Sequence, residues 1–155
     1  MVSMPKSPFY AKGLRFSCSR CSSCCRHEPG YVFLSREDLH TLSRALNLSA
    51  ASFTDAYCRW VPAEGGMYRL SLREKRSFDC VLWEEGGCSV YGARPLQCRS
   101  FPFWPANLAS AAAWESERSR CPGVGAGAPH PRAEIEAYLA AQRGNPPLTR
   151  EGDPW

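Results

Sequence analysis

The sequence CSRCSSCC, residues 18–25, places four cysteines within eight positions. Cys18, Cys21 and Cys24 follow the spacing C-x2-C-x2-C, which lets several thiolates converge on one metal centre. Cys25 directly follows Cys24, and neighbouring side chains in extended backbone point to opposite sides. The adjacent pair therefore serves two ions, or one ion and a second role, unless a turn brings both thiols onto one cluster. We interpret this stretch as a metal-binding motif.

Five more cysteines follow the motif. The first, Cys58, lies on the apolar side of a predicted helix beside Tyr57, and we expect it to be a buried thiol that binds no metal. The other four bring the number of candidate ligands to eight, which matches two four-thiolate sites, or one iron–sulfur cluster and one zinc ion. These four are Cys80, Cys88, Cys98 and Cys121.

Positive charge and a histidine lie close to the motif. No acidic residue precedes Glu28, whereas five basic residues do. Nearby positive charge favours the thiolate form that binds metals, although a basic N-terminal arm would explain the same bias. His27 is the best nitrogen candidate for a ligand, but a hydrogen bond to a loop carbonyl is the slightly favoured interpretation. Arginines near the cysteines could donate N–H groups to sulfur or offset thiolate charge; they are Arg20, Arg26, Arg94 and Arg99.

Length and composition limit the function classes. The chain has 155 residues, the size of one domain, and a net charge of +4 that requires no nucleic-acid partner. No recognised nucleic-acid module is present, so we expect no such partner. No run approaches the roughly 18 apolar residues of a membrane span, and the start has no secretory signal. We therefore expect a cytoplasmic protein without a membrane partner, in which reduced cysteines favour metal binding or redox chemistry over stable disulfides.

Two helices are predicted in the first half of the chain. Leucines recur at near-helical spacing after Ser35 and Asp38, a weak capping-box variant, which predicts a helix over residues 36–47. Ser49 can cap a second helix over residues 50–60.

Two strands and two more helices are predicted further along. The runs 67–73 and 78–84 predict the strands of a short antiparallel meander, and the residues EEGG, 84–87, predict a turn after the second run and before Cys88. Alanine-rich composition predicts a helix within residues 106–120, and Pro131 sits where the first position of a last helix tolerates proline. Two stretches are predicted to lack regular structure, namely a flexible link at 123–130 and a frayed tail at 144–155.

These elements predict a small irregular α+β domain, with about four short helices around a short antiparallel strand pair and with metal holding the loops together. We expect residues 14–125 to form this cysteine-cluster metal-binding domain. A basic N-terminal arm, residues 1–13, would precede it. A linker, a C-terminal helix and a tail, residues 126–155, would follow it.

Three stretches together resemble a known family. They are FSCSRCSSCCRHEPGYVFLS (16–35), CVLWEEGGCSVYGARPLQCRSFPFWP (80–105), and a tryptophan followed by RCPG (120–123). In this order they are similar to the YkgJ-type cysteine-cluster proteins, which are described as zinc- or iron-chelating domains. The resemblance covers roughly residues 14–125. It implies that the ligands are Cys18, Cys21, Cys24, Cys25, Cys80, Cys88, Cys98 and Cys121.

Two functional hypotheses stay open. The first is an iron–sulfur cluster, zinc or both, in a redox role or as an accessory to protein modification. A similar cysteine pattern occurs in flagellin lysine N-methylases, to which an iron–sulfur centre is ascribed, and this favours iron without implying methylation. The alternative is a non-catalytic, zinc-stabilised module that binds other proteins. We expect a protein partner in both cases, whereas the sequence leaves open whether the chain is an enzyme and what its oligomeric state is.

Overall fold

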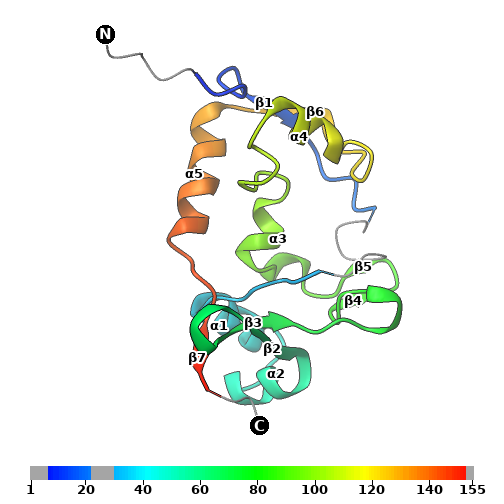
Figure 1. Cartoon of the computed structure of the whole chain (residues 1–155). Helices are drawn as coiled ribbons and strands as arrows, with labels where there is room; N and C mark the ends of the chain where they lie inside the picture. The colour runs from blue at the N-terminus through cyan, green and yellow to red at the C-terminus, as the bar shows by residue number, and fades with distance from the viewer. Residues whose placement is uncertain (1–6, 22–29, 153–155) are drawn as a thin grey trace. The chain divides into compact units, whose positions relative to one another are not determined.

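The computed structural model of the chain describes residues 7–21 and 30–152 (Figure 1). The chain divides into two units, each built from an early and a late segment. The first unit holds residues 1–21 and 102–140, and the second unit holds residues 22–101 and 141–155. Short helices and small antiparallel sheets make up the described residues, so the fold class is α+β, as the sequence predicts.

A two-stranded antiparallel sheet lies in the first unit. It pairs β1 (Leu14–Phe16) with β6 (Val124–His130). The prediction of a flexible link at residues 123–130 is therefore wrong, because most of that stretch is strand. Glycine content suggested a link, but the same glycines allow a close approach between the two strands.

The approach of β6 to β1 depends on glycine at two positions. A Cβ atom on Gly123 would lie 2.1 Å from the carbonyl oxygen of Ser17, and one on Gly127 would lie 1.9 Å from the Ser17 hydroxyl oxygen. Gly127 also has a φ of +76°, which residues with a side chain rarely adopt. Only glycine fits beside Ser17 at these two places.

The apolar core of the first unit surrounds the ring of Phe103. Trp114 on α4 (Ala111–Glu117) stacks on it with ring centroids 5.6 Å apart, and Tyr138 on α5 (Arg132–Arg143) stacks at the same separation. Stacked aromatic side chains bury a large apolar area. The sequence predicts both helices, although α4 is shorter than the stretch from which it was inferred.

A three-stranded antiparallel sheet forms the centre of the second unit. Its strands are β2 (Cys58–Pro62), β3 (Met67–Leu72) and β7 (Thr149–Glu151), in the order β2-β3-β7. The prediction of a frayed tail after residue 144 is wrong at β7, where the described part of the tail pairs with β3. The predicted second helix also ends earlier than expected, and its last residues form β2.

The meander predicted from runs 67–73 and 78–84 forms only in part. The second run returns antiparallel to the first, but its isolated bridge joins Cys80 to Glu74, one residue beyond the first run. The run then enters a hairpin, in which β4 (Trp83–Glu84) pairs with β5 (Gly87–Cys88). The turn that the sequence predicts at residues 84–87 is confirmed, whereas the main partner of β3 is β2.

Two capped helices cover the second unit. In α1 (Arg36–Ala45) the Ser35 hydroxyl accepts the Asp38 N–H at 3.0 Å, and the Asp38 carboxylate accepts the Ser35 N–H at 3.1 Å. This reciprocal pair is a capping box, as predicted. Ser49 caps α2 (Ala50–Tyr57) by accepting the N–H of Ser52.

Short elements complete the second unit. They are three 3-10 turns and a five-residue helix, namely η2 (Glu64–Gly66), η3 (Arg76–Phe78), η4 (Tyr91–Ala93) and α3 (Leu96–Ser100). The buried core beneath them contains Leu34, Leu42, Phe53, Cys58, Leu70, Leu72, Leu82 and Val90. None of the helices in residues 7–21 and 30–152 has the length and apolar character that crossing a membrane requires.

Candidate metal centre

The hairpin of β4 and β5 brings two predicted ligands together. Cys88 ends β5 and lies opposite Trp83 on β4, while Cys80 precedes β4 by three residues. The backbone N–H of Trp83 donates to the Cys80 carbonyl at 2.9 Å, which folds the chain back toward the hairpin. The two thiols are close enough for the charge of one to act on the other. The hairpin therefore presents two thiols as a pair.

Two backbone N–H groups are directed at the sulfur of Cys80. Burial raises the pKa of this thiol, hydrogen bonds from the backbone of Leu82 and Trp83 lower it, and the neighbouring Cys88 raises it. Burial has the largest effect, so the net shift is upward. N–H groups aimed at sulfur stabilise a thiolate, and a bound cation would offset the charge that burial penalises. This environment is suited to a metal ligand.

The same type of contact occurs at Cys18 in the first unit. The backbone N–H of Arg20 donates to the Cys18 sulfur over 3.4 Å. Arg20 has a φ of +56°, so the chain turns sharply between Cys18 and Cys21. The donor to Cys18, and one of the two donors to Cys80, is the N–H two residues further along the chain. In the first unit as in the second, the local backbone is arranged around a sulfur atom.

The pairing of β1 with β6 places Cys18 and Cys121 on neighbouring segments of the first unit. Phe16 is paired with Val124, and the Ser17 N–H donates to the Gly123 carbonyl at 3.2 Å. Cys18 follows this contact on one segment, and Cys121 precedes it on the other, since the two segments run antiparallel. Antiparallel register thus brings a motif cysteine and a cysteine about a hundred residues later to neighbouring segments of one unit.

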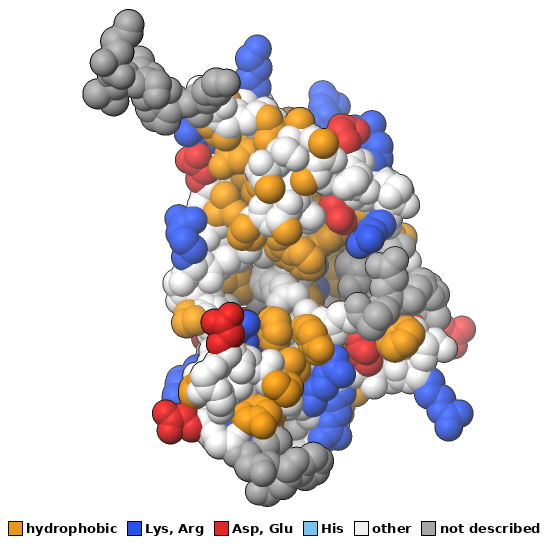
Figure 2. All heavy atoms as spheres, in the orientation of Figure 1, with side chains coloured by type: hydrophobic (Ala, Val, Ile, Leu, Met, Phe, Trp, Pro, Cys, Tyr) orange, Lys and Arg blue, Asp and Glu red, His pale blue; other side chains and the backbone are white. Residues whose placement is uncertain are grey.

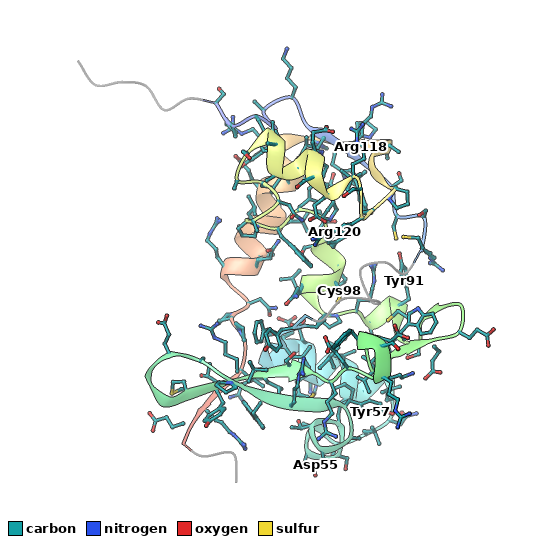
Figure 3. The ribbon with its side chains drawn as sticks, turned by 45° about the vertical axis from the view of Figure 1, so that its right-hand side comes forward. Asp55, Tyr57, Tyr91, Cys98, Arg118 and Arg120 are labelled. Atoms are coloured by element: carbon teal, nitrogen blue, oxygen red, sulfur yellow. The ribbon has the colours of Figure 1, made fainter. Side chains whose placement is uncertain are left out.

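Cys98 lies on α3, which is labelled in Figure 1 and whose cysteine is labelled in Figure 3. The buried carboxylate of Asp38 accepts the N–H of Leu96, the first residue of α3, at 3.1 Å. Arg94 stacks its guanidinium 3.8 Å from the centroid of the Tyr91 ring. These contacts fix the start of the helix and therefore the position of Cys98 within the second unit.

The arginines near the candidate ligands bind backbone carbonyls in the contacts that the structure defines. Arg94 donates through Nε to the Tyr91 carbonyl at 3.0 Å, and Arg99 donates through Nε to the Arg94 carbonyl, also at 3.0 Å. Figure 2 shows lysine and arginine side chains in several separate places on the face drawn, interspersed with acidic and apolar side chains. At Cys18 and Cys80, backbone N–H groups are directed at sulfur.

Cys58 is buried, as the sequence predicts. It is 2% exposed and belongs to the apolar core of the second unit. It is the first residue of β2 rather than part of the helix from which burial was inferred. Burial raises the pKa of its thiol from 9.0 to about 12, against a lowering by Arg73. Cys58 is thus a neutral core residue at physiological pH.

The described residues hold six of the eight predicted ligands. Cys24 and Cys25 lie outside the described residues, as do His27 and Arg26. Within residues 7–21 and 30–152, no group of three or more Cys, His, Asp or Glu side chains is close enough to hold a metal ion. Within the described part of the chain, Cys80 and Cys88 come close to each other, and the complete ligand set stays a prediction.

The donor chemistry fits the metals that were predicted. Thiolates are soft ligands that select Zn2+ and iron–sulfur clusters, whereas carboxylates and carbonyls suit Mg2+ and Ca2+. Backbone N–H groups on sulfur orient such ligands and tune the metal centre. Backbone N–H groups of this kind are directed at the sulfurs of Cys80 and Cys18.

Sequence reasoning missed the small residues that support the cysteines. Ser17 precedes Cys18, and Gly123 follows Cys121 by two positions, yet only the structure reveals that they touch. Their proximity in sequence to cysteines was the available signal. It was not sufficient, because the register of β1 against β6 cannot be read from either segment alone.

Comparison with known proteins also points to a zinc- or iron-chelating domain. No solved structure matches the chain. Residues 17–122 match the model of the CxxCxxCC family, whose description is "Putative zinc- or iron-chelating domain". The matched range contains the CSRCSSCC motif, the Cys80–Cys88 hairpin, Cys98 and Cys121. The chain therefore belongs to the CxxCxxCC family of zinc- or iron-chelating domains.

Proposed function

We propose that the chain binds an iron–sulfur cluster, zinc or both through eight thiolates, in a redox role or as an accessory to protein modification. The ligands would be Cys18, Cys21, Cys24, Cys25, Cys80, Cys88, Cys98 and Cys121. Membership of a zinc- or iron-chelating family supports metal binding in general. The assignment of these eight residues and of the redox role goes beyond it.

One observation carries the proposal most directly. The sulfur of Cys80 is half-buried, is paired with Cys88 and is approached by two backbone N–H groups. Burial favours the neutral form of this thiol, so binding as a thiolate requires a counter-charge, which a metal ion would supply. The N–H of Arg20 is likewise directed at the sulfur of a predicted ligand, Cys18, which is exposed.

The alternative is a zinc-stabilised module without catalysis. It is favoured by the amount of short and irregular structure, since the second unit contains three 3-10 turns and a hairpin with two residues in each strand. Metal ligation contributes folding energy directly in such domains. Exposed aromatic side chains at Tyr31 and Phe78 would suit a protein partner in either role.

Anaerobic purification separates these possibilities. An iron–sulfur protein is brown and absorbs visible light, whereas a zinc thiolate protein is colourless. Elemental analysis beside the absorption spectrum then gives the metal and its stoichiometry. Colourless protein with stoichiometric zinc would eliminate the redox role. Protein without bound zinc or iron would eliminate both roles.

Single substitutions test the ligand set. Cys80→Ala and Cys88→Ala should each lower the metal content, because the two thiols lie close together, one on the hairpin and one just before it. Cys58→Ala is the matched control, since it also removes a thiol from the second unit but from the apolar core. Equal metal loss in all three variants would contradict the assignment of Cys58 as a core residue.

A further inference from the structure

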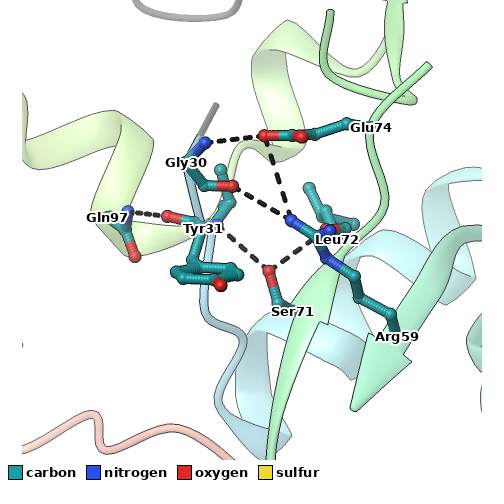
Figure 4. A network of polar contacts seen from close by, with 8 residues as sticks. Gly30, Tyr31, Arg59, Ser71, Leu72, Glu74 and Gln97 are labelled. Atoms are coloured by element: carbon teal, nitrogen blue, oxygen red, sulfur yellow. Dashed lines mark hydrogen bonds and ion pairs between the residues drawn. The ribbon is translucent and has the colours of Figure 1, made fainter. Parts of the chain in front are cut away.

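Four side chains hold one short backbone segment, residues 30–33, in the second unit (Figure 4). Gly30 is the first described residue after the CSRCSSCC motif. Phe33 forms an isolated bridge with Ser71, and none of residues 30–33 lies in a named strand. Much of the segment's hydrogen bonding is therefore supplied by side chains from other elements, which are Arg59, Ser71, Glu74 and Gln97.

An ion pair binds both polar groups of Gly30. The Gly30 N–H donates to Oε1 of Glu74 at 2.7 Å, and the Arg59 guanidinium donates to the Gly30 carbonyl at 3.1 Å. The same guanidinium nitrogen lies 3.9 Å from Oε1 of Glu74. The Arg59 guanidinium also lies 5.0 Å from the centroid of the Tyr31 ring. Charge-assisted hydrogen bonds of this kind are stronger than neutral ones.

The amide of Gln97 binds the next residues from α3. Its Nε2 donates to the Tyr31 carbonyl at 2.8 Å, and its Oε1 accepts the Phe33 N–H at 3.0 Å. A side-chain amide thus makes the two contacts that a neighbouring strand would otherwise make. The Ser71 hydroxyl, on β3, accepts the Val32 N–H at 3.2 Å. The N–H groups of Val32 and Phe33 thus meet oxygen acceptors, and the carbonyl of Tyr31 meets an N–H donor.

The residues that hold the segment are adjacent to predicted ligands. Gln97 directly precedes Cys98 on α3, and the backbone of Glu74 forms the antiparallel bridge with Cys80. Position 30 is thus fixed relative to the backbone that carries Cys80 and Cys98. Since Gly30 lies five positions after Cys25, chain length alone limits the distance between their Cα atoms to ~18 Å.

We infer that Gln97 and Glu74 are positioning residues for the metal centre: they fix the chain leaving the CSRCSSCC motif beside the segments that carry Cys98 and Cys80. This inference rests on the proposed function. Neither side chain binds the metal in this account. Each acts by holding backbone, so that less conformational entropy is lost when thiolates from distant segments bind one centre.

The competing explanation is that these contacts only stabilise the fold. It predicts that substitutions lower stability and leave metal affinity as in any equally destabilised variant. The positioning role predicts a loss of affinity beyond that. Gln97→Ala removes both amide contacts. Gln97→Glu keeps the side-chain length and the acceptor for the Phe33 N–H, but it loses the donor to the Tyr31 carbonyl. It should therefore destabilise the fold less than Gln97→Ala.

The experiment compares Gln97→Ala, Gln97→Glu and Glu74→Ala with the wild type, all as full chains. Zinc affinity is measured by competition with a chromophoric chelator, and the thiolate-to-metal charge-transfer absorption is recorded after loading with Co2+. We expect the zinc affinity to fall about 10- to 100-fold, the range found when groups that orient metal ligands are removed. We also expect the charge-transfer spectrum to change, which a purely structural role would not require.

Leu46→Ala is the matched control. Leu46 packs against the core of the same unit, and its apolar side chain makes none of the hydrogen bonds that hold residues 30–33, so its loss lowers stability and leaves those hydrogen bonds in place. Affinity and spectrum in the Gln97 and Glu74 variants that equal those of Leu46→Ala would overturn the inference alone. A wild type that binds neither zinc nor Co2+ would overturn the proposed function, and the inference with it.

Discussion

The hydroxyl oxygen of Ser17 accepts a hydrogen bond from the backbone N–H of Ala128 at 2.9 Å, across 111 residues of sequence. Ala128 belongs to the irregular part of β6, where the register against β1 shifts. The contact therefore ties the residue before Cys18 to the strand that follows Cys121. It links the geometry of the motif to a segment far away in the sequence.

This contact makes Gly127 a sensitive position. In Gly127→Ala the new Cβ would lie 1.9 Å from the Ser17 hydroxyl, at a φ of +76°. We expect a loss of about 2–4 kcal/mol in the free energy of unfolding, from steric overlap added to backbone strain. Urea denaturation measures it.

Gly66→Ala is the control for that prediction. Gly66 has a similar φ of +72°, but nothing lies within 4 Å of its Cβ position. Only backbone strain applies there, at a cost of about 1–2 kcal/mol. If both variants lost the same stability, the close approach of Gly127 to Ser17 would be contradicted.

Asp38 connects three segments of the second unit. Its carboxylate, 5% exposed, accepts the N–H groups of Ser35 and Leu96 and the side-chain N–H of Asn145. Asp38→Ala leaves these donors without an acceptor, and we expect a cost of roughly 2–4 kcal/mol. Thermal unfolding measures it.

The exposed neighbour Glu37 is the control for Asp38. It lies in the same first turn of α1 but is exposed. Glu37→Ala should change stability by no more than about 0.5 kcal/mol. An Asp38→Ala variant as stable as Glu37→Ala would show that the carboxylate does not hold α1, α3 and the C-terminal segment together.

The Cys58 thiol should resist alkylation in the folded protein. Its pKa is raised to about 12, so it is protonated and buried at pH 8, whereas thiolate is the reactive form. Mass spectrometry after iodoacetamide treatment should find Cys58 modified only once denaturant is added. Modification of Cys58 under native conditions would contradict its burial.

The same shift sets a pH dependence. The folded protein holds the Cys58 proton more tightly than the unfolded chain, in which the thiol pKa is near 9.0. The stability that this provides is complete below about pH 9 and is lost as the pH rises through about 12. Cys58→Ala should unfold less steeply with alkali than the wild type. Identical alkaline unfolding of both proteins would argue against the shift.

Local signals in the sequence predict the capped helices well. Ser35 and Asp38 form the predicted capping box, and Ser49 caps the next helix, because capping depends on residues within one turn. The turn at residues 84–87 is likewise local, and it produces the hairpin that carries Cys88. Such contacts need no knowledge of distant segments.

Strand pairing was less predictable. The sequence suggested a flexible link where β6 forms. It also paired β3 with the run 78–84, whose isolated bridge joins Cys80 to Glu74, beyond the end of β3. Pairing joins residues as distant as Arg15 and Pro129, and the glycines that permit it resemble a linker until the opposing Ser17 is known. The cysteine spacing predicted the ligand type, but which thiols share a centre depends on this long-range register.

Metal X-ray absorption spectroscopy tests the central claim most directly, on the wild type, Cys18→Ala, Cys88→Ala and the control Cys58→Ala. We predict a zinc or iron site with sulfur neighbours at about 2.3 Å in the wild type and in Cys58→Ala. We predict fewer sulfur neighbours or less metal in both Cys18→Ala and Cys88→Ala, because thiolates from the motif and from the hairpin both bind. A first shell of nitrogen and oxygen, or a Cys88→Ala spectrum and metal content identical to the wild type, would contradict the account.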